Sequence, residues 1–239
     1  MLPDCLHRLL STVRGHDRLH FFWAILSLFT FPFPYRFRYW FITQWCNFNL
    51  WWLKVTCGLD YRVEGGEHLP NEPGIVMCKH QSTWETMALE QIFVPQSWVL
   101  KRELMRIPLF GWALALLDPI PIDRSSHSEA VRQIVQRGKE RLNQGRWVVI
   151  FPEGTRVAPG ERGHYHPAGA FLATRSGAKV IPVAHNAGEF WGRRQFVKRP
   201  GTITLRIGPP IDANGKKPKE INHLVEEWIE SQMKEISTL

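Results

Sequence analysis

The sequence predicts an α/β fold: a mostly parallel central sheet flanked by helices, preceded by an N-terminal two-helix membrane-associating hairpin. Two observations predict it. From residue 59 onward, short apolar runs alternate with amphipathic stretches, the pattern of a parallel sheet covered by helices. The first 58 residues differ, because they hold five Trp and eight Phe before position 53. We therefore expect a hairpin over residues 1–58 and an α/β domain over residues 59–239.

In the α/β domain, apolar runs and turn residues mark the expected elements. Strands are expected at residues 61–64, 75–78, 98–100, 120–123, 147–151, 180–185 and 202–207. Helices are expected at residues 128–143, 167–176 and 218–236, where apolar residues recur at helical spacing. In a parallel sheet the loops after the strands meet at one edge, where open α/β folds bind their ligands.

The N-terminal segment predicts two helices that lie partly in one leaflet of a membrane. The apolar run 21–31 ends at Pro32 and Pro34, and as a helix it covers roughly 16 Å, about half of a ~30 Å hydrocarbon core. A second helix, 39–55, carries aromatic residues on one face. The alternative is a helical pair packed on the soluble domain. The candidate membrane contacts are Phe21, Phe22, Trp23, Phe41, Trp45, Phe48 and Trp52.

The chain is basic, with 30 Lys and Arg against 22 Asp and Glu and a formal net charge of +8. This excess suits an anionic partner such as an acidic membrane face or a phosphorylated substrate, although a solvated basic surface is the simpler alternative. Nucleic acid is the least favoured partner, because the basic residues form no stripe. The four cysteines lack disulfide or metal-ligand spacing and indicate a reducing compartment.

A candidate acid–base pair follows the strand expected at 75–78. His80 is suited to general-base catalysis because imidazole titrates near neutrality. Glu85 can hold its second ring nitrogen if His80 lies in a loop and Glu85 in the first helical turn. The alternative is structural, since Ser82-x-x-Glu85 is also a capping-box pattern.

Charged residues follow three further strands. The segment from Glu153 through Gly154 and Thr155 to Arg156 suits an anion-binding turn, in which the guanidinium grips a phosphate. Glu153 is expected to bond acceptor hydroxyls or to orient Arg156. The other candidate phosphate ligands are Lys101, Arg102 and Arg124. The alternative for each cation is an ordinary surface ion pair.

No nucleophile accompanies the base, since no Gly-x-Ser-x-Gly elbow occurs. This indicates that the substrate brings its own hydroxyl, which attacks an activated acyl donor directly. A lipid hydrolase and a non-catalytic lipid-binding protein are the rivals. His164 and His166 have no further ligands at metal-site spacing, so no metal site is expected.

Four blocks, in order, resemble the glycerolipid acyltransferase family typified by 1-acylglycerol-3-phosphate acyltransferase. They are residues 80–85 (HQSTWE), 101–124 (KRELMRIP through DPIPIDR), 151–156 (FPEGTR) and 180–183 (VIPV). One residue departs from the family pattern, which has Asp where this chain has Glu85.

The resemblance implies acyl transfer from acyl-CoA or acyl carrier protein to the sn-2 hydroxyl of 1-acylglycerol-3-phosphate, giving phosphatidic acid for phospholipid biosynthesis. The alternative acceptor is a lysolipid with another head group. It implies that His80 is the base, that Glu85 supports it, and that the second and third blocks bind the acceptor phosphate. It places Val180, Ile181, Pro182 and Val183 near the acyl pocket. It also implies no metal or organic cofactor, and residence at the cytoplasmic face of a bacterial inner membrane.

Overall fold

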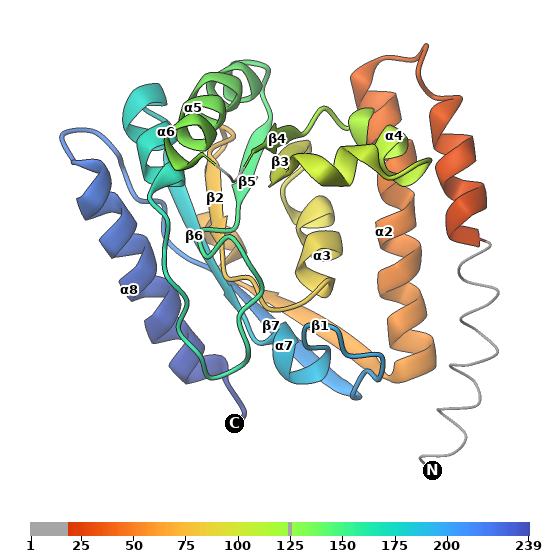
Figure 1. Cartoon of the computed structure of the whole chain (residues 1–239). Helices are drawn as coiled ribbons and strands as arrows, with labels where there is room; N and C mark the ends of the chain where they lie inside the picture. The colour runs from red at the N-terminus through yellow and green to blue at the C-terminus, as the bar shows by residue number, and fades with distance from the viewer. Residues whose placement is uncertain (1–18, 124–125) are drawn as a thin grey trace.

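The computed structural model describes residues 19–123 and 126–239, which form a seven-stranded sheet with helices on both faces (Figure 1). The strand order is β1-β7-β6-β2-β5-β3-β4. The strands are β1 (Leu59–Glu64), β2 (Ile75–Cys78), β3 (Gln96–Lys101), β4 (Ile120–Ile122), β5 (Trp147–Ile150), β6 (Val180–His185) and β7 (Gly201–Ile207). Each overlaps a predicted strand, and the mostly parallel α/β fold is confirmed.

One strand pair departs from the parallel pattern. β6 and β7 are antiparallel, whereas the other pairs, β1–β7 included, are parallel. Only the four-residue helix α7 (Ala187–Phe190) and a loop connect β6 to β7. Without a full crossover helix the chain returns in the opposite direction. The central strands β6, β2, β5 and β3 remain parallel, so their carboxyl ends share one edge.

The sheet buries both faces. Side chains alternate along β2, so that Ile75 and Met77 join the core under one set of helices, while Val76 and Cys78 join the core on the opposite face. Helices α5 (His127–Asn143), α6 (Ala168–Ser176) and α8 (Pro218–Ile236) cover the first face, as Figure 1 shows. Helices α2 (Tyr35–Cys57) and α3 (Trp84–Ile92) cover the second.

The remaining short elements are outside the predicted set. They are α4 (Phe110–Ala115) and two 3-10 helices, η1 (Gly66–His68) and η2 (Arg102–Arg106). Each has six residues or fewer, too short for an apolar period to show in the sequence.

The N-terminal segment forms a helical pair packed on the α/β domain. A first helix covers residues 19–28, and α2 begins directly after Pro34 and ends at Gly58, whose φ of 63° is the left-handed conformation that glycine favours. On the domain side, the Tyr39 hydroxyl donates to the buried Glu90 carboxylate of α3 at 2.5 Å. Thr43 is also buried, and its carbonyl accepts from Gln91 Nε2 of α3 at 3.1 Å. Within residues 19–123 and 126–239, no helix is both long and apolar enough to cross a bilayer.

The candidate membrane contacts fall into two groups. Phe21 and Phe22 are exposed. The other five are half-buried and stack along the helical pair, with the Trp23 and Phe41 rings 4.9 Å apart. Other large apolar side chains are exposed on the helical pair and its turn: Ile25, Phe29, Phe31, Phe33, Phe37, Trp40, Trp51 and Val55.

Candidate active site

The candidate site is built on the loop that follows β2. Its main chain is held at both sides of His80: the His80 N–H donates to Glu153 Oε2 at 2.8 Å, and the His80 carbonyl accepts from Val157 N–H at 2.9 Å. Both partners belong to the loop after β5. Because β2 and β5 are neighbouring parallel strands, the first and third sequence blocks lie together at one edge of the sheet.

The structure brings His80 and Glu85 into contact. The Nδ1–Oε1 distance is 2.8 Å, with the Glu85 carboxylate fully buried. The same carboxylate accepts the main-chain N–H groups of Gln81 and Ser82, and Ser82 Oγ accepts the Trp84 N–H at 3.1 Å. The two interpretations offered for Glu85 therefore coexist, because one carboxylate both holds the imidazole and caps α3.

The electrostatics set the proton positions. Burial by itself would raise the pKa of Glu85, but the hydrogen bond from His80 and the main-chain N–H donors lower it below its usual range. Glu85 is therefore ionised, and the hydrogen between the two groups belongs to His80 Nδ1. That leaves Nε2 as the ring nitrogen that accepts a proton. The imidazole lies flat on the Phe151 ring, 3.9 Å away, which fixes its orientation.

A second histidine lies behind the pair. His185 at the end of β6 is fully buried, and burial lowers its pKa, so it is uncharged near neutral pH. Its Nε2–H donates to the Lys79 carbonyl at 2.8 Å, and its Nδ1 accepts the Ala187 N–H at 3.2 Å. It supports the loop main chain and does not line the cavity described below.

Both carboxylate oxygens of Glu153 accept hydrogen bonds from the chain itself. Its Oε1 accepts from Lys79 Nζ at 2.7 Å, both side chains being buried, while its Oε2 holds the His80 main chain. Burial raises the pKa of Glu153, and Lys79 partly offsets this. The structure thus places the carboxylate against Lys79 and the His80 loop rather than against Arg156.

The basic residues predicted after the strands have different surroundings. Lys101 pairs with Glu103 at 3.3 Å, and Arg102 with Asp123 at 3.6 Å, so for these two the surface ion pair is observed. Arg124 lies outside the described residues. Arg156 is half-buried, and its guanidinium forms no ion pair with a carboxylate of the described residues.

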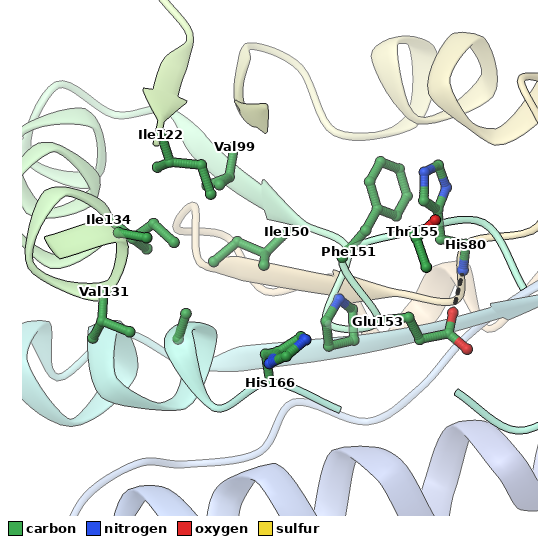
Figure 2. A pocket seen from close by; sticks show the side chains of 14 residues that line it. His80, Val99, Ile122, Val131, Ile134, Ile150, Phe151, Glu153, Thr155 and His166 are labelled. Carbon is green, nitrogen blue, oxygen red and sulfur yellow. Dashed lines mark hydrogen bonds between the residues drawn. The ribbon is translucent and has the colours of Figure 1, made fainter. Parts of the chain in front are cut away.

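An apolar cavity of about 310 Å³ begins at His80 and extends between the sheet and helices α5 and α6. Figure 2 shows His80, Phe151 and Thr155 at one end and Val131 and Ile134 toward the other. The remaining lining residues are Val99, Ile122, Ala130, Ile150, Pro152, Glu153, Gly154, His166 and Ala168. The residues predicted for the acyl pocket, 180–183, do not line this cavity. They belong to the central strand β6 and are buried.

Comparisons with known proteins identify the family of this chain. The family model described as Acyltransferase matches residues 60–186, which is more than half of the chain. The 1-acyl-sn-glycerol-3-phosphate acyltransferase of Pseudomonas aeruginosa is 47% identical over 224 residues, covering 92% of this chain and 87% of that protein. The chain belongs to this acyltransferase family. The enzyme of the same name from Saccharomyces cerevisiae is 30% identical, over 77% of this chain and 62% of its own length.

The acyltransferase fold is also seen in a solved structure. The crystal structure of the 1-acyl-sn-glycerophosphate (LPA) acyltransferase PlsC from Thermotoga maritima superposes with a TM-score of 0.79, covering 98% of each chain at 22% identity. At that identity the likeness concerns the fold, including its N-terminal helices.

Several residues around this candidate site could not be predicted from the sequence. Lys79 stands directly before His80, but nothing in the sequence showed that its side chain is buried. Its partner Glu230 lies 151 positions away on α8. The sequence does not distinguish the cavity residues Val99, Ile122 and Ile134 from core residues. An apolar side chain that lines a cavity gives the same sequence pattern as one that fills a core.

Proposed function

We propose that this acyltransferase moves a fatty acyl group from acyl-CoA or acyl carrier protein to the sn-2 hydroxyl of 1-acylglycerol-3-phosphate, giving phosphatidic acid. The observation that carries the proposal is the His80–Glu85 contact, with His80 lining one end of an apolar cavity. The identity to the Pseudomonas relative supports the acceptor.

The mechanism follows from the proton positions. His80 Nε2 takes the proton of the acceptor hydroxyl as its oxygen attacks the thioester carbonyl. The imidazolium that forms lies against the Glu85 carboxylate, which stabilises it. When the tetrahedral intermediate collapses, the C–S bond breaks and the imidazolium returns its proton to the departing thiolate. The proton balance closes without a covalent acyl-enzyme.

Arg156 is the group that we assign to the acceptor phosphate. It follows the cavity residues Gly154 and Thr155, and its guanidinium is not committed to a carboxylate of the described residues. A guanidinium binds a phosphate through two parallel hydrogen bonds. Gly154, at a φ of 65°, makes the turn that carries it, a backbone conformation strained for other residues. Lys101, Arg102 and Arg124 are further candidates.

The apolar cavity is suited to an acyl chain. Its lining is aliphatic away from His80, and its volume of about 310 Å³ is that of a small-molecule site. A chain placed there leaves its reactive end at the imidazole. This assignment replaces residues 180–183 as the expected acyl pocket.

We propose that the N-terminal helical pair docks on the cytoplasmic face of a bacterial inner membrane and enters one leaflet. Its outward surface exposes Phe22, Phe29 and Trp40 among other large apolar residues, and such clusters mark lipid or protein contacts. Docking by this route brings the site to the lipids that it uses.

The test is a lipid product assay with the purified protein in vesicles, a panel of lysolipids and both donor types. We expect phosphatidic acid from 1-acylglycerol-3-phosphate, and its loss in His80→Ala with vesicle binding unchanged. Free fatty acid in place of diacyl product would instead indicate the hydrolase. A near-normal turnover of His80→Ala would contradict the mechanism.

A further inference from the structure

One stripe of α8 holds the long loop that follows β5. Asn222, Glu226 and Glu230 recur every four residues and so share a helix face. Asn222 Nδ2 donates to the Tyr165 carbonyl at 3.0 Å, Arg162 Nη2 donates to Glu226 Oε1 at 2.7 Å, and the Tyr165 hydroxyl donates to Glu230 Oε1 at 2.8 Å. The family match ends at residue 186, so α8 lies outside the segment that it covers.

Glu230 differs from the other two because it reaches the interior. Lys79 Nζ donates to Glu230 Oε1 at 2.8 Å and to Glu153 Oε1 at 2.7 Å, and the Lys79 side chain is only 1% exposed. The Glu161 carbonyl accepts a third bond at 3.3 Å. A buried ammonium is stable only where carboxylates balance its charge and each N–H has an acceptor. The two carboxylates and the carbonyl meet both conditions for Lys79.

This network ends at the base. Glu153 Oε1 is held by Lys79, which leaves Oε2 to accept the His80 main-chain N–H at 2.8 Å, a bond drawn in Figure 2. The chain of contacts therefore runs from Glu230 through Lys79 and Glu153 to the main chain of His80. Glu230 does not line the cavity, so it acts only through these groups.

We propose that Glu230 is a positioning residue for acyl transfer, which fixes the His80 loop through Lys79 and Glu153. The inference rests on the proposed function. Its physical basis is that the buried Lys79 would shift toward Glu153 if its second carboxylate lost its charge. Glu153 would then turn away from the His80 N–H, and the imidazole would move relative to Glu85 and the acceptor hydroxyl. Displacements of about 1 Å cost up to roughly a hundredfold in rate.

The experiment compares Glu230→Gln with Glu226→Gln in the full chain, reconstituted in vesicles with 1-acylglycerol-3-phosphate and acyl-CoA. The control removes a carboxylate from the same stripe, one turn away, whose partner Arg162 is exposed. We expect kcat to fall roughly tenfold to a hundredfold in Glu230→Gln, with KM values within about threefold. Glu226→Gln keeps both. Combining Glu230→Gln with Glu153→Gln adds little to the loss from Glu153→Gln alone, because the two residues act in series.

A second readout does not depend on activity. We expect the NMR signals of the His80 amide and imidazole to shift in Glu230→Gln and to stay in place in Glu226→Gln. A lower melting temperature with an unchanged kcat and unchanged His80 signals would overturn the inference. If the wild-type chain makes no phosphatidic acid, the proposed function fails, while the His80 signals still test whether Glu230 positions the His80 loop.

If Glu230→Gln does not fold, Tyr165→Phe takes its place. It removes one hydrogen bond to Glu230 and leaves the charges, so a severalfold fall in kcat supports the inference and an unchanged kcat refutes it.

Discussion

Replacing Glu85 by Gln tests whether its charge assists the reaction. The substitution keeps the shape of the side chain but removes the negative charge beside the imidazolium. At the observed 2.8 Å and an effective dielectric constant of about 20, the lost attraction is about 6 kcal/mol. At about 1.36 kcal/mol per decade this is about 4.4 decades, which sets an upper limit of roughly 2 × 10⁴-fold on the loss of kcat. Because His80 is partly exposed to solvent, we expect a loss between roughly 10²-fold and 10⁴-fold.

The assay measures initial rates of phosphatidic acid formation at saturating donor and acceptor, by mass spectrometry. The matched control is Glu227→Gln, because Glu227 lies on the exposed side of α8 and, among the residues that the structure describes, forms an ion pair only with His223. Circular dichroism separates loss of fold from loss of chemistry, since Glu85 also caps α3. A folded Glu85→Gln protein that kept its rate within threefold would refute the role of the charge.

Glu85→Asp forms a second arm of this test. The side chain shortens by one C–C bond, about 1.5 Å, while the Cα of residue 85 stays fixed in the first turn of α3. The carboxylate then cannot hold both the imidazole and the N–H groups of Gln81 and Ser82. We expect a fall in kcat of roughly tenfold to a hundredfold, although the resemblance implies Asp at this position. Full activity would show that the loop follows the shorter side chain.

Three further predictions concern the helical pair, the cavity and a buried acid. Trp51→Ala should weaken vesicle binding roughly tenfold, whereas Phe171→Ala on α6, across the sheet, should not. Val131→Phe should shift the acyl preference toward shorter chains in a donor panel, because it fills the cavity away from His80. Burial raises the pKa of Glu90 from 4.5 to about 7, so the folded state binds the extra proton and stability falls as pH rises between these values. Glu90→Gln should remove the contribution of Glu90 and so flatten the slope of melting temperature against pH between 4.5 and 7.5.

The sequence predicted those parts of the structure that depend on local pattern. Buried strands appear in the sequence as short apolar runs, so all seven strands were located. Pro34 and Gly58 stand directly before and after α2, and both residue types commonly mark the ends of a helix. The antiparallel direction of β7 was not predictable, because an apolar run looks the same for a parallel and an antiparallel strand. The segment that connects β6 to β7 decides the direction. The length of α2 was underestimated, since its first turn lies among aromatic residues rather than in an amphipathic pattern.

In the candidate site, too, the contacts between residues near in sequence were predictable and those between distant residues were not. His80 and Glu85 are five positions apart, so a loop followed by a helix cap was enough to predict their contact. The bond between Lys79 and Glu230 joins residues 151 apart and depends on how α8 crosses the sheet, which no local pattern encodes. The cavity was missed for a similar reason, since its lining comes from β3, β4, β5, α5 and α6.

Helix α3 connects the two halves of the proposed function. Its first turn carries Glu85, the partner of His80, and one turn and a half further on it carries Glu90. The Glu90 carboxylate accepts the Tyr39 hydroxyl of α2 and the Trp98 indole of β3. A nine-residue helix tied at both ends cannot bend independently of either. The distance between the outward face of α2 and the imidazole is therefore set by packing. A site held at a fixed depth below a docking surface suits an enzyme whose acceptor and product both remain in the lipid layer.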